Sequence, residues 1–137
     1  MTLELNLRIV GAVLITLGIS HVAYGKRFEW KTELARLSLL NRQIFIVHCF
    51  FISLTLVLMG GITLFYTRAL LEPTVLSRVG LVAMVIFWLC RLVIQFFVYD
   101  SALWRGNKFN TRMHVFFSVI WSYVVLTYSL AAKHAWH

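Results

Sequence analysis

Four long apolar runs divide the chain and constrain its fold more than any other feature. They lie at about residues 5–24, 44–66, 79–99 and 113–130. A helix that rises ~1.5 Å per residue needs about 20 apolar residues to cross a ~30 Å hydrocarbon layer. Because the connections between the runs are short, consecutive helices should lie side by side and antiparallel. The sequence therefore predicts an all-α fold, an integral membrane up-down four-helix bundle that forms one domain over residues 1–137.

The composition supports membrane insertion and excludes the main soluble classes. Of the 137 residues, 61% are hydrophobic and 13% are charged, whereas average globular chains are roughly 45–50% apolar and about 25% charged. Such a chain is too apolar and too poor in charge for an ordinary water-soluble domain or a disordered segment. One proline and seven glycines leave few breaks, which favours long helices.

The first connection, residues 25–43, mixes charged side chains with apolar ones. Leu34, Leu37 and Leu40 recur at every third position beside charges. This pattern predicts a short amphipathic helix that lies in the plane of the lipid headgroups.

Predicted N-caps lie before the last two spans. Thr74 or Ser77 is expected to cap the third span, and Thr111 the fourth, because a hydroxyl can accept from the first free backbone N–H groups.

The distribution of Lys and Arg predicts the orientation in the membrane. The first and third connections share one side, which holds Lys26, Arg27, Lys31, Arg36, Arg42, Arg105, Lys108 and Arg112. The other side holds Arg8, Arg68, Arg78 and Lys133. By the positive-inside rule, the first side is cytoplasmic and both termini face out of an inner membrane. The net charge of +8 is divided among membrane flanks, so we expect contact with lipid headgroups and no binding of nucleic acid.

Five histidine, arginine and glutamine side chains stand inside the predicted spans beyond the flanking Arg8, and each is costly there without a partner or a role. They are His21, His48, Arg91, Gln95 and His114. Because neighbouring helices run antiparallel, all five should lie in the cytoplasmic half of the membrane. The sequence therefore predicts a common site at that level.

Helical spacing predicts which of these groups face the bundle interior. Side chains at steps of three and four share one face in three spans: Gly11, Leu14, Gly18 and His21; Trp88, Arg91, Gln95 and Tyr99; and Thr111, His114, Ser118 and Trp121. His48 shares its face with Phe51, Ile52 and Thr55, bulky neighbours that suit lipid contact as well as packing. Convergence is therefore better supported for three helices than for the second.

Imidazole chemistry makes a metal or haem site the first functional hypothesis. Neutral His is the commonest protein ligand for metals, and bundles build such sites from facing helices. We expect His21, His48 and His114 to bind haem b or a transition metal, Zn or Fe. Arg91 would pair with haem propionates, and the residues bordering the cofactor would be Arg91, Gln95, Trp88 and Tyr99. In helix number and inward histidines the chain is similar to the small four-helix cytochrome b subunits of membranes.

Two other classes of function fit the same residues. In the first, a metal-free enzyme or binder holds the phosphate or carboxylate of an anionic lipid-like molecule on Arg91 while a histidine moves a proton. In the second, the chain is a non-catalytic subunit of a larger membrane complex, a quinone-binding partner or a homo-oligomer. The spacing identifies no catalytic residue, and whether the chain is an enzyme stays open.

Overall fold

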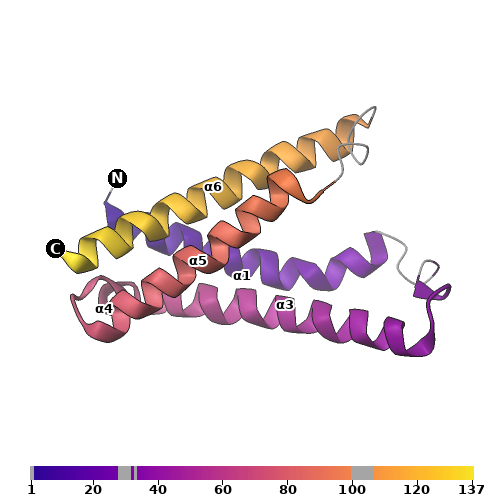
Figure 1. Cartoon of the computed structure of the whole chain (residues 1–137), viewed down its shortest axis with the longest axis horizontal. Helices are drawn as coiled ribbons and strands as arrows, with labels where there is room; N and C mark the ends of the chain where they lie inside the picture. The colour runs from indigo at the N-terminus through magenta and orange to yellow at the C-terminus, as the bar shows by residue number, and fades with distance from the viewer. Residues whose placement is uncertain (1, 28–31, 33, 100–106) are drawn as a thin grey trace. The chain divides into compact units, whose positions relative to one another are not determined.

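The computed structural model describes residues 2–27, 32, 34–99 and 107–137. Its long helices are α1 (Leu3–Arg27), α3 (Leu39–Phe65), α5 (Val75–Phe97) and α6 (Lys108–Trp136), and a short helix α4 covers Thr67–Leu71 (Figure 1). The described residues contain no strand. Each long helix contains a stretch long and apolar enough to cross a membrane. The all-α prediction is confirmed, and the four apolar helices are compatible with a four-helix membrane bundle.

Many large apolar side chains lie on the outside of these helices, as contact with lipid requires. Leu76 and Phe97 are 84% and 82% exposed. In water such a surface would be unfavourable, whereas acyl chains solvate it without cost. The chain is therefore a multi-pass membrane protein whose helix surfaces contact lipid.

Each long helix begins before its predicted span, and α3 and α5 do so at polar N-caps. α3 begins at Leu39, before the predicted span, and the Ser38 hydroxyl accepts from the backbone N–H of Asn41 at 3.3 Å. α5 has the predicted cap, since Thr74 and Ser77 form a reciprocal capping box.

The prediction that Thr111 caps the fourth span is wrong. α6 begins at Lys108, and its N-cap is Asn107, whose side chain accepts from two backbone N–H groups. Thr111 lies inside the helix and donates its hydroxyl hydrogen to the Asn107 carbonyl at 3.0 Å. An asparagine just outside the apolar run thus provides the cap that the run itself could not reveal.

The predicted amphipathic helix in the connection 25–43 falls largely outside the described residues, which omit 28–31 and 33. At its edges the described chain differs from the prediction, because α1 continues to Arg27 and α3 already includes Leu40. Between them, the Leu37 N–H donates to the Leu34 carbonyl at 3.2 Å, which forms a turn.

Contacts divide the chain into two units, which we describe separately. The N-terminal unit is Arg8–Thr67, and the C-terminal unit combines Arg68–His137 with the segment that ends at Leu7.

In the N-terminal unit, α1 and α3 pack antiparallel at very short range. A Cβ atom on Gly11 would lie 2.8 Å from the Gly60 carbonyl oxygen, and one on Gly60 would lie 2.7 Å from the Gly11 carbonyl oxygen. The Ser53 hydroxyl donates to the Gly18 carbonyl at 2.6 Å. Glycines therefore bring the two backbones into contact, and the interhelical hydrogen bond fixes their register.

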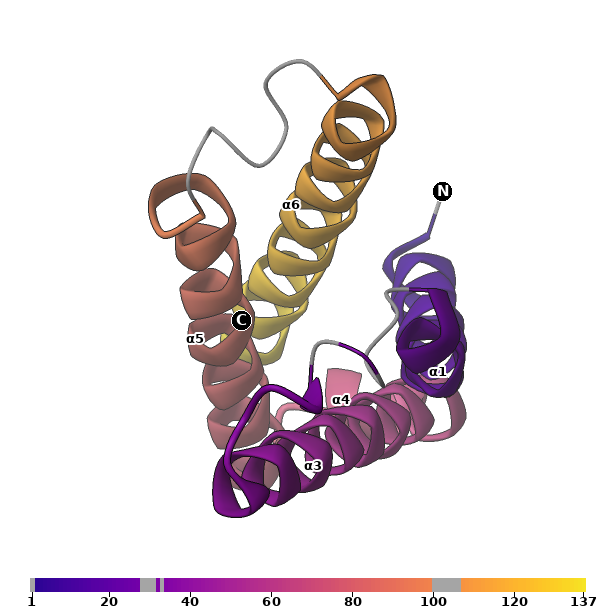
Figure 2. The ribbon, with the colours of Figure 1, turned by 90° about the vertical axis from the view of Figure 1, so that its right-hand side faces the viewer.

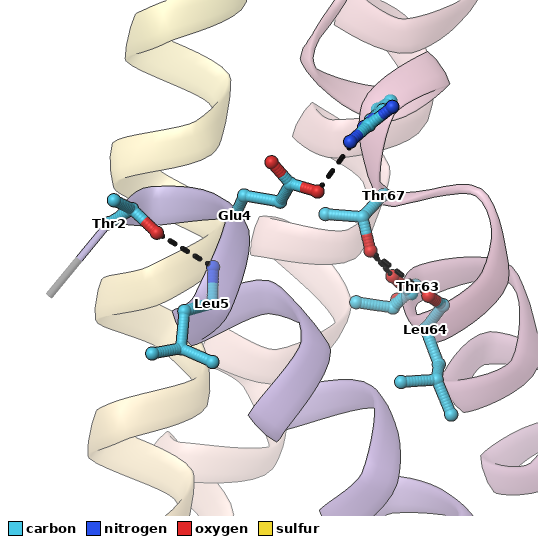
Figure 3. Close-up of polar contacts among 7 residues, drawn as sticks. Thr2, Glu4, Leu5, Thr63, Leu64 and Thr67 are labelled. Atoms are coloured by element: carbon cyan, nitrogen blue, oxygen red, sulfur yellow. Dashed lines mark hydrogen bonds and ion pairs between the residues drawn. The ribbon is translucent and has the colours of Figure 1, made fainter.

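The N-terminal unit ends where α3 gives way to α4. Here the Thr67 hydroxyl donates to the carbonyls of Thr63 and Leu64, and Figure 3 shows these bonds beside the Thr67 side chain. Thr63 and Thr67 are both buried. The hydroxyl thus satisfies carbonyls that the end of a helix leaves without an N–H partner.

In the C-terminal unit, α5 and α6 run antiparallel beside each other (Figures 1 and 2). Their buried residues follow steps of three, four and seven on α5, at Ser77, Leu81, Met84, Trp88 and Gln95. The α6 face contributes Trp121, Val124, Tyr128, Ala131 and Ala135. Such spacing is typical of two helices that interlock along one seam.

Polar contacts join separate segments of the C-terminal unit. Arg78 Nε donates to the Ala135 carbonyl near the end of α6 at 2.8 Å. The Tyr123 hydroxyl donates to Asn6 Oδ1 at 2.7 Å, and Glu4 accepts from Arg68 Nε at 3.4 Å. Figure 3 shows the Glu4 side chain reaching from the first turn of α1 toward this partner.

Candidate functional site

The apolar seam between α5 and α6 becomes polar toward the end of α5. On α5 the buried stripe passes from Trp88 to Gln95, and Arg91 fills the position between them at steps of three and four. Gln95 is 5% exposed and Arg91 is half-buried. His114, on the facing part of α6, is also half-buried. We call Arg91, Gln95 and His114 the polar seam.

A directional chain of hydrogen bonds joins the three side chains. Arg91 Nη1 donates to Gln95 Oε1 at 3.1 Å, and Gln95 Nε2 lies 2.9 Å from His114 Nδ1. Because arginine can only donate, it fixes the orientation of the amide, and the amide nitrogen must then donate to the ring. His114 is therefore a neutral imidazole that accepts at Nδ1 and carries its proton on Nε2.

Aromatic rings hold the guanidinium of Arg91 from two directions. Its Cζ lies 5.0 Å from the centre of the Trp121 ring and 5.8 Å from that of Tyr99. Trp121 in turn stacks on Trp88, with ring centres 5.1 Å apart and planes at 14°. Cation–π contacts of this kind are stronger in a desolvated site than in water, so the rings help to keep the charge within the seam.

The positive charge of Arg91 has no carboxylate partner among the described residues. Their acidic residues are Glu4 and Glu72, and Glu4 pairs with Arg68. Asp100 lies outside the described residues. Of the five N–H donors of a guanidinium, the bond to Gln95 accounts for one. The remaining donors suit an oxyanion.

The structure places the predicted site residues in two groups. Arg91, Gln95, His114, Trp88 and Tyr99 all belong to the C-terminal unit, where the contacts above connect them. His21 and His48 belong to the N-terminal unit.

His21 and His48 each bond to their own helix. His21 Nδ1 lies 2.9 Å from the Leu17 carbonyl and His48 Nδ1 lies 2.8 Å from the Ile44 carbonyl. A carbonyl can only accept, so both Nδ1 atoms carry a hydrogen. Both rings therefore have the tautomer opposite to that of His114, with the electron pair of the neutral form on Nε2.

His21 and His48 lie at similar heights along the antiparallel helices α1 and α3, but their side chains point in different directions. Since Gly18 lies opposite Ser53, His21 is level with a position two residues from His48, about 3 Å along the axis. On α3, however, His48 lies about 140° around the helix from Ser53. His48 is exposed, so it points away from the α1–α3 contact that His21 flanks.

The described residues contain no group of three or more His, Cys, Asp and Glu side chains that could hold a metal ion. In the polar seam, Nδ1 of His114 accepts from Gln95 and its hydrogen is on Nε2. A metal ligand needs a nitrogen with a lone pair, so His114 could bind metal only after the hydrogen bonds to Gln95 rearranged. The three-histidine cofactor site stays a prediction.

Trp121, a buried residue of α6 at its contact with α5, was not among the predicted site residues. Its spacing from His114 places both residues on one helix face, and that spacing was the available signal. The stacking on Trp88 and the contact with Arg91 depend on how α6 packs against α5, which spacing within one helix cannot reveal.

Comparisons with known proteins give no indication of function. No protein-family model, curated protein or solved structure matches this chain.

Proposed function

We propose that this membrane protein binds an anionic, lipid-like molecule through Arg91. The observation that carries the proposal is a half-buried guanidinium on a membrane helix, held by two aromatic rings and one amide, with no carboxylate partner among the described residues. A charge in an apolar layer is retained mainly where it has a function or a partner. A phosphate or carboxylate supplied by a ligand would be that partner.

The guanidinium of Arg91 binds an oxyanion better than a simple point charge, such as an ammonium group, would. A guanidinium presents parallel N–H groups that can bind two oxygens of a phosphate or carboxylate at once. Gln95 and the ring faces restrict its rotation, which lowers the entropy lost on binding. His114 accepts from Gln95 and so supports the amide from α6. We assign binding to the site and no reaction.

The proposed ligand would enter from the cytoplasmic leaflet of an inner membrane. Arg91 lies in the second half of α5, and His114 lies near the start of α6. This end of both helices adjoins the third connection, which carries part of the larger set of Lys and Arg residues. The positive-inside rule makes this side cytoplasmic and leaves both termini outside.

The Arg91→Lys variant tests the proposal. We expect it to bind dodecyl phosphate and laurate about tenfold more weakly than wild type, because lysine keeps the charge but loses the planar pair of donors. Isothermal titration calorimetry in neutral detergent micelles measures the affinity.

Arg68→Lys is the matched control, since Arg68 is an exposed arginine in the same unit. Its affinity should equal that of wild type. Equal affinity in Arg91→Lys, or wild-type binding of dodecanol as tight as that of dodecyl phosphate, would contradict the proposal.

A second candidate function is the binding of haem or a metal by His21 or His48, each as a single ligand because the two rings point in different directions. One observation favours it: both rings donate from Nδ1 to a carbonyl, as ligating histidines commonly do. On this hypothesis the purified protein shows a Soret band, or stoichiometric Zn or Fe, which His21→Ala or His48→Ala removes. Colourless, metal-free protein isolated from cells grown with haem precursor and both metals would contradict it.

A further inference from the structure

Two buried indole N–H groups lack a hydrogen-bond partner. Trp88 and Trp121 are 1% and 6% exposed, and within the described residues each Nε1 is covered by protein without an acceptor. Buried indole N–H groups usually find a partner. Leaving one unpaired costs about 1–3 kcal/mol, so two on adjacent rings require an explanation.

These two donors lie beside Arg91, where α5 packs against α6. The indole rings stack on each other at 5.1 Å, and the Arg91 guanidinium lies 5.0 Å from the centre of the Trp121 ring. Trp88 precedes Arg91 by three residues, which is about 4.5 Å along α5. A cation and two unsatisfied donors therefore lie within about one helical turn.

This arrangement selects among amphiphiles by the position of their acceptors. A fatty acid or an alkyl phosphate carries all its acceptors at one end and would engage Arg91 alone. An acyl glycerophosphate carries a phosphate and, a few ångströms nearer its tail, an uncharged ester carbonyl. Arg91 lies nearer than Trp88 to the end of α5, so the two kinds of donor follow the order of phosphate and carbonyl in such a lipid.

We propose that the polar seam takes an acyl glycerophosphate, whose phosphate binds Arg91 and whose ester carbonyl accepts from an indole N–H of Trp88 or Trp121. This inference rests on the proposed function and names its ligand class. Because both Nε1 atoms are covered in the ligand-free protein, a side chain at the seam must move when the carbonyl enters.

A pair of matched ligands tests the inference on the unaltered protein. The probes are 1-lauroyl-glycerol-3-phosphate and its ether analogue, 1-dodecyl-glycerol-3-phosphate, which lacks the carbonyl. Wild type should bind the ester about tenfold more tightly than the ether, the value of one good hydrogen bond. Titration calorimetry in neutral detergent measures both affinities.

Replacing the donors identifies the residues responsible. Substitution of Trp88 and Trp121 by 3-benzothienylalanine exchanges each N–H for sulfur and keeps the size of the ring. In the doubly substituted protein the ratio of ester affinity to ether affinity should fall from about ten to about one, whatever change the altered Trp121 ring makes to both affinities through its contact with Arg91. The same substitution at Trp136, which is 61% exposed, should preserve the preference.

The outcomes separate this inference from the proposed function. Equal binding of ester and ether by wild type, with both weakened in Arg91→Lys, overturns the assignment of the carbonyl and supports the anion site. A preference for the ester that survives loss of both indole N–H groups also overturns the assignment. Failure of wild type to bind either phosphate overturns the proposed function itself.

Discussion

The Gly60→Leu variant should lose roughly 3 kcal/mol or more of its free energy of unfolding, since overpacking a tight contact typically costs 1–3 kcal/mol and occasionally more. The added Cβ alone would lie 2.7 Å from the Gly11 carbonyl oxygen and 2.9 Å from the Ile15 nitrogen. Both neighbours are backbone atoms of α1, so no side-chain rotation can relieve the clash. The helices must separate, which also removes the bond from Ser53 to Gly18.

Gly61→Leu is the matched control for Gly60→Leu. The two glycines are adjacent in α3, yet a Cβ on Gly61 meets nothing within 4 Å. Both substitutions change helix propensity and hydrophobicity equally, so the difference between the variants isolates the contact with α1. Unfolding in a detergent mixture, followed by circular dichroism, measures it. Equal stability of the two variants would show that α1 and α3 do not approach through Gly60.

The number of long helices and the all-α class could be predicted from the sequence because lipid imposes a simple requirement. A helix must be apolar over about 20 residues to span the hydrocarbon layer, and no other element satisfies the backbone of a single run there. Helix ends are less constrained. The Asn107 cap and the short helix α4 lie where the chain leaves the apolar layer, and local hydrogen bonds determine them.

The polar seam could be predicted in part. Steps of three and four already place Arg91 and Gln95 on one face of α5, and Trp88 with them. The role of His114 could not be predicted, because the orientation of one amide decides which ring nitrogen accepts. Arg91 sets that orientation through a 3.1 Å bond, and the amide then donates to His114. The sequence indicates that a histidine is present but not which tautomer its neighbours impose.

His48 shows the other limit of prediction from spacing. Its neighbours Phe51 and Ile52 suit either lipid or protein, so the pattern alone leaves its direction open. The contact of Ser53 with Gly18 provides the missing reference, since it identifies the side of α3 that faces α1. Relative to that side, His48 points away.

The Gln95→Glu variant should bind dodecyl phosphate about a hundredfold more weakly than wild type, an effect typical of altering a close, partly buried charge pair. A carboxylate at this position would accept from Arg91 in place of the amide oxygen, 3.1 Å away in wild type. It would also require His114 to donate from Nδ1. The guanidinium would then have an internal partner, so the ligand would have to compete with it.

Two further variants show whether internal neutralisation is the cause. Gln43→Glu makes the same change of charge at an exposed position, and its affinity should be within about twofold of wild type, because exposed charges are largely screened.

Gln95→Leu removes both hydrogen bonds but supplies no anion. It should be less stable than wild type and still bind the phosphate more tightly than Gln95→Glu, which should keep its stability. If Gln95→Leu and Gln95→Glu lose binding equally, Gln95 acts by holding the guanidinium in place, and its lack of charge is irrelevant. If only Gln95→Glu loses binding, the ligand binds to the unpaired charge of Arg91. Position 95 must then be neutral, because a carboxylate there would pair with Arg91 in place of the ligand.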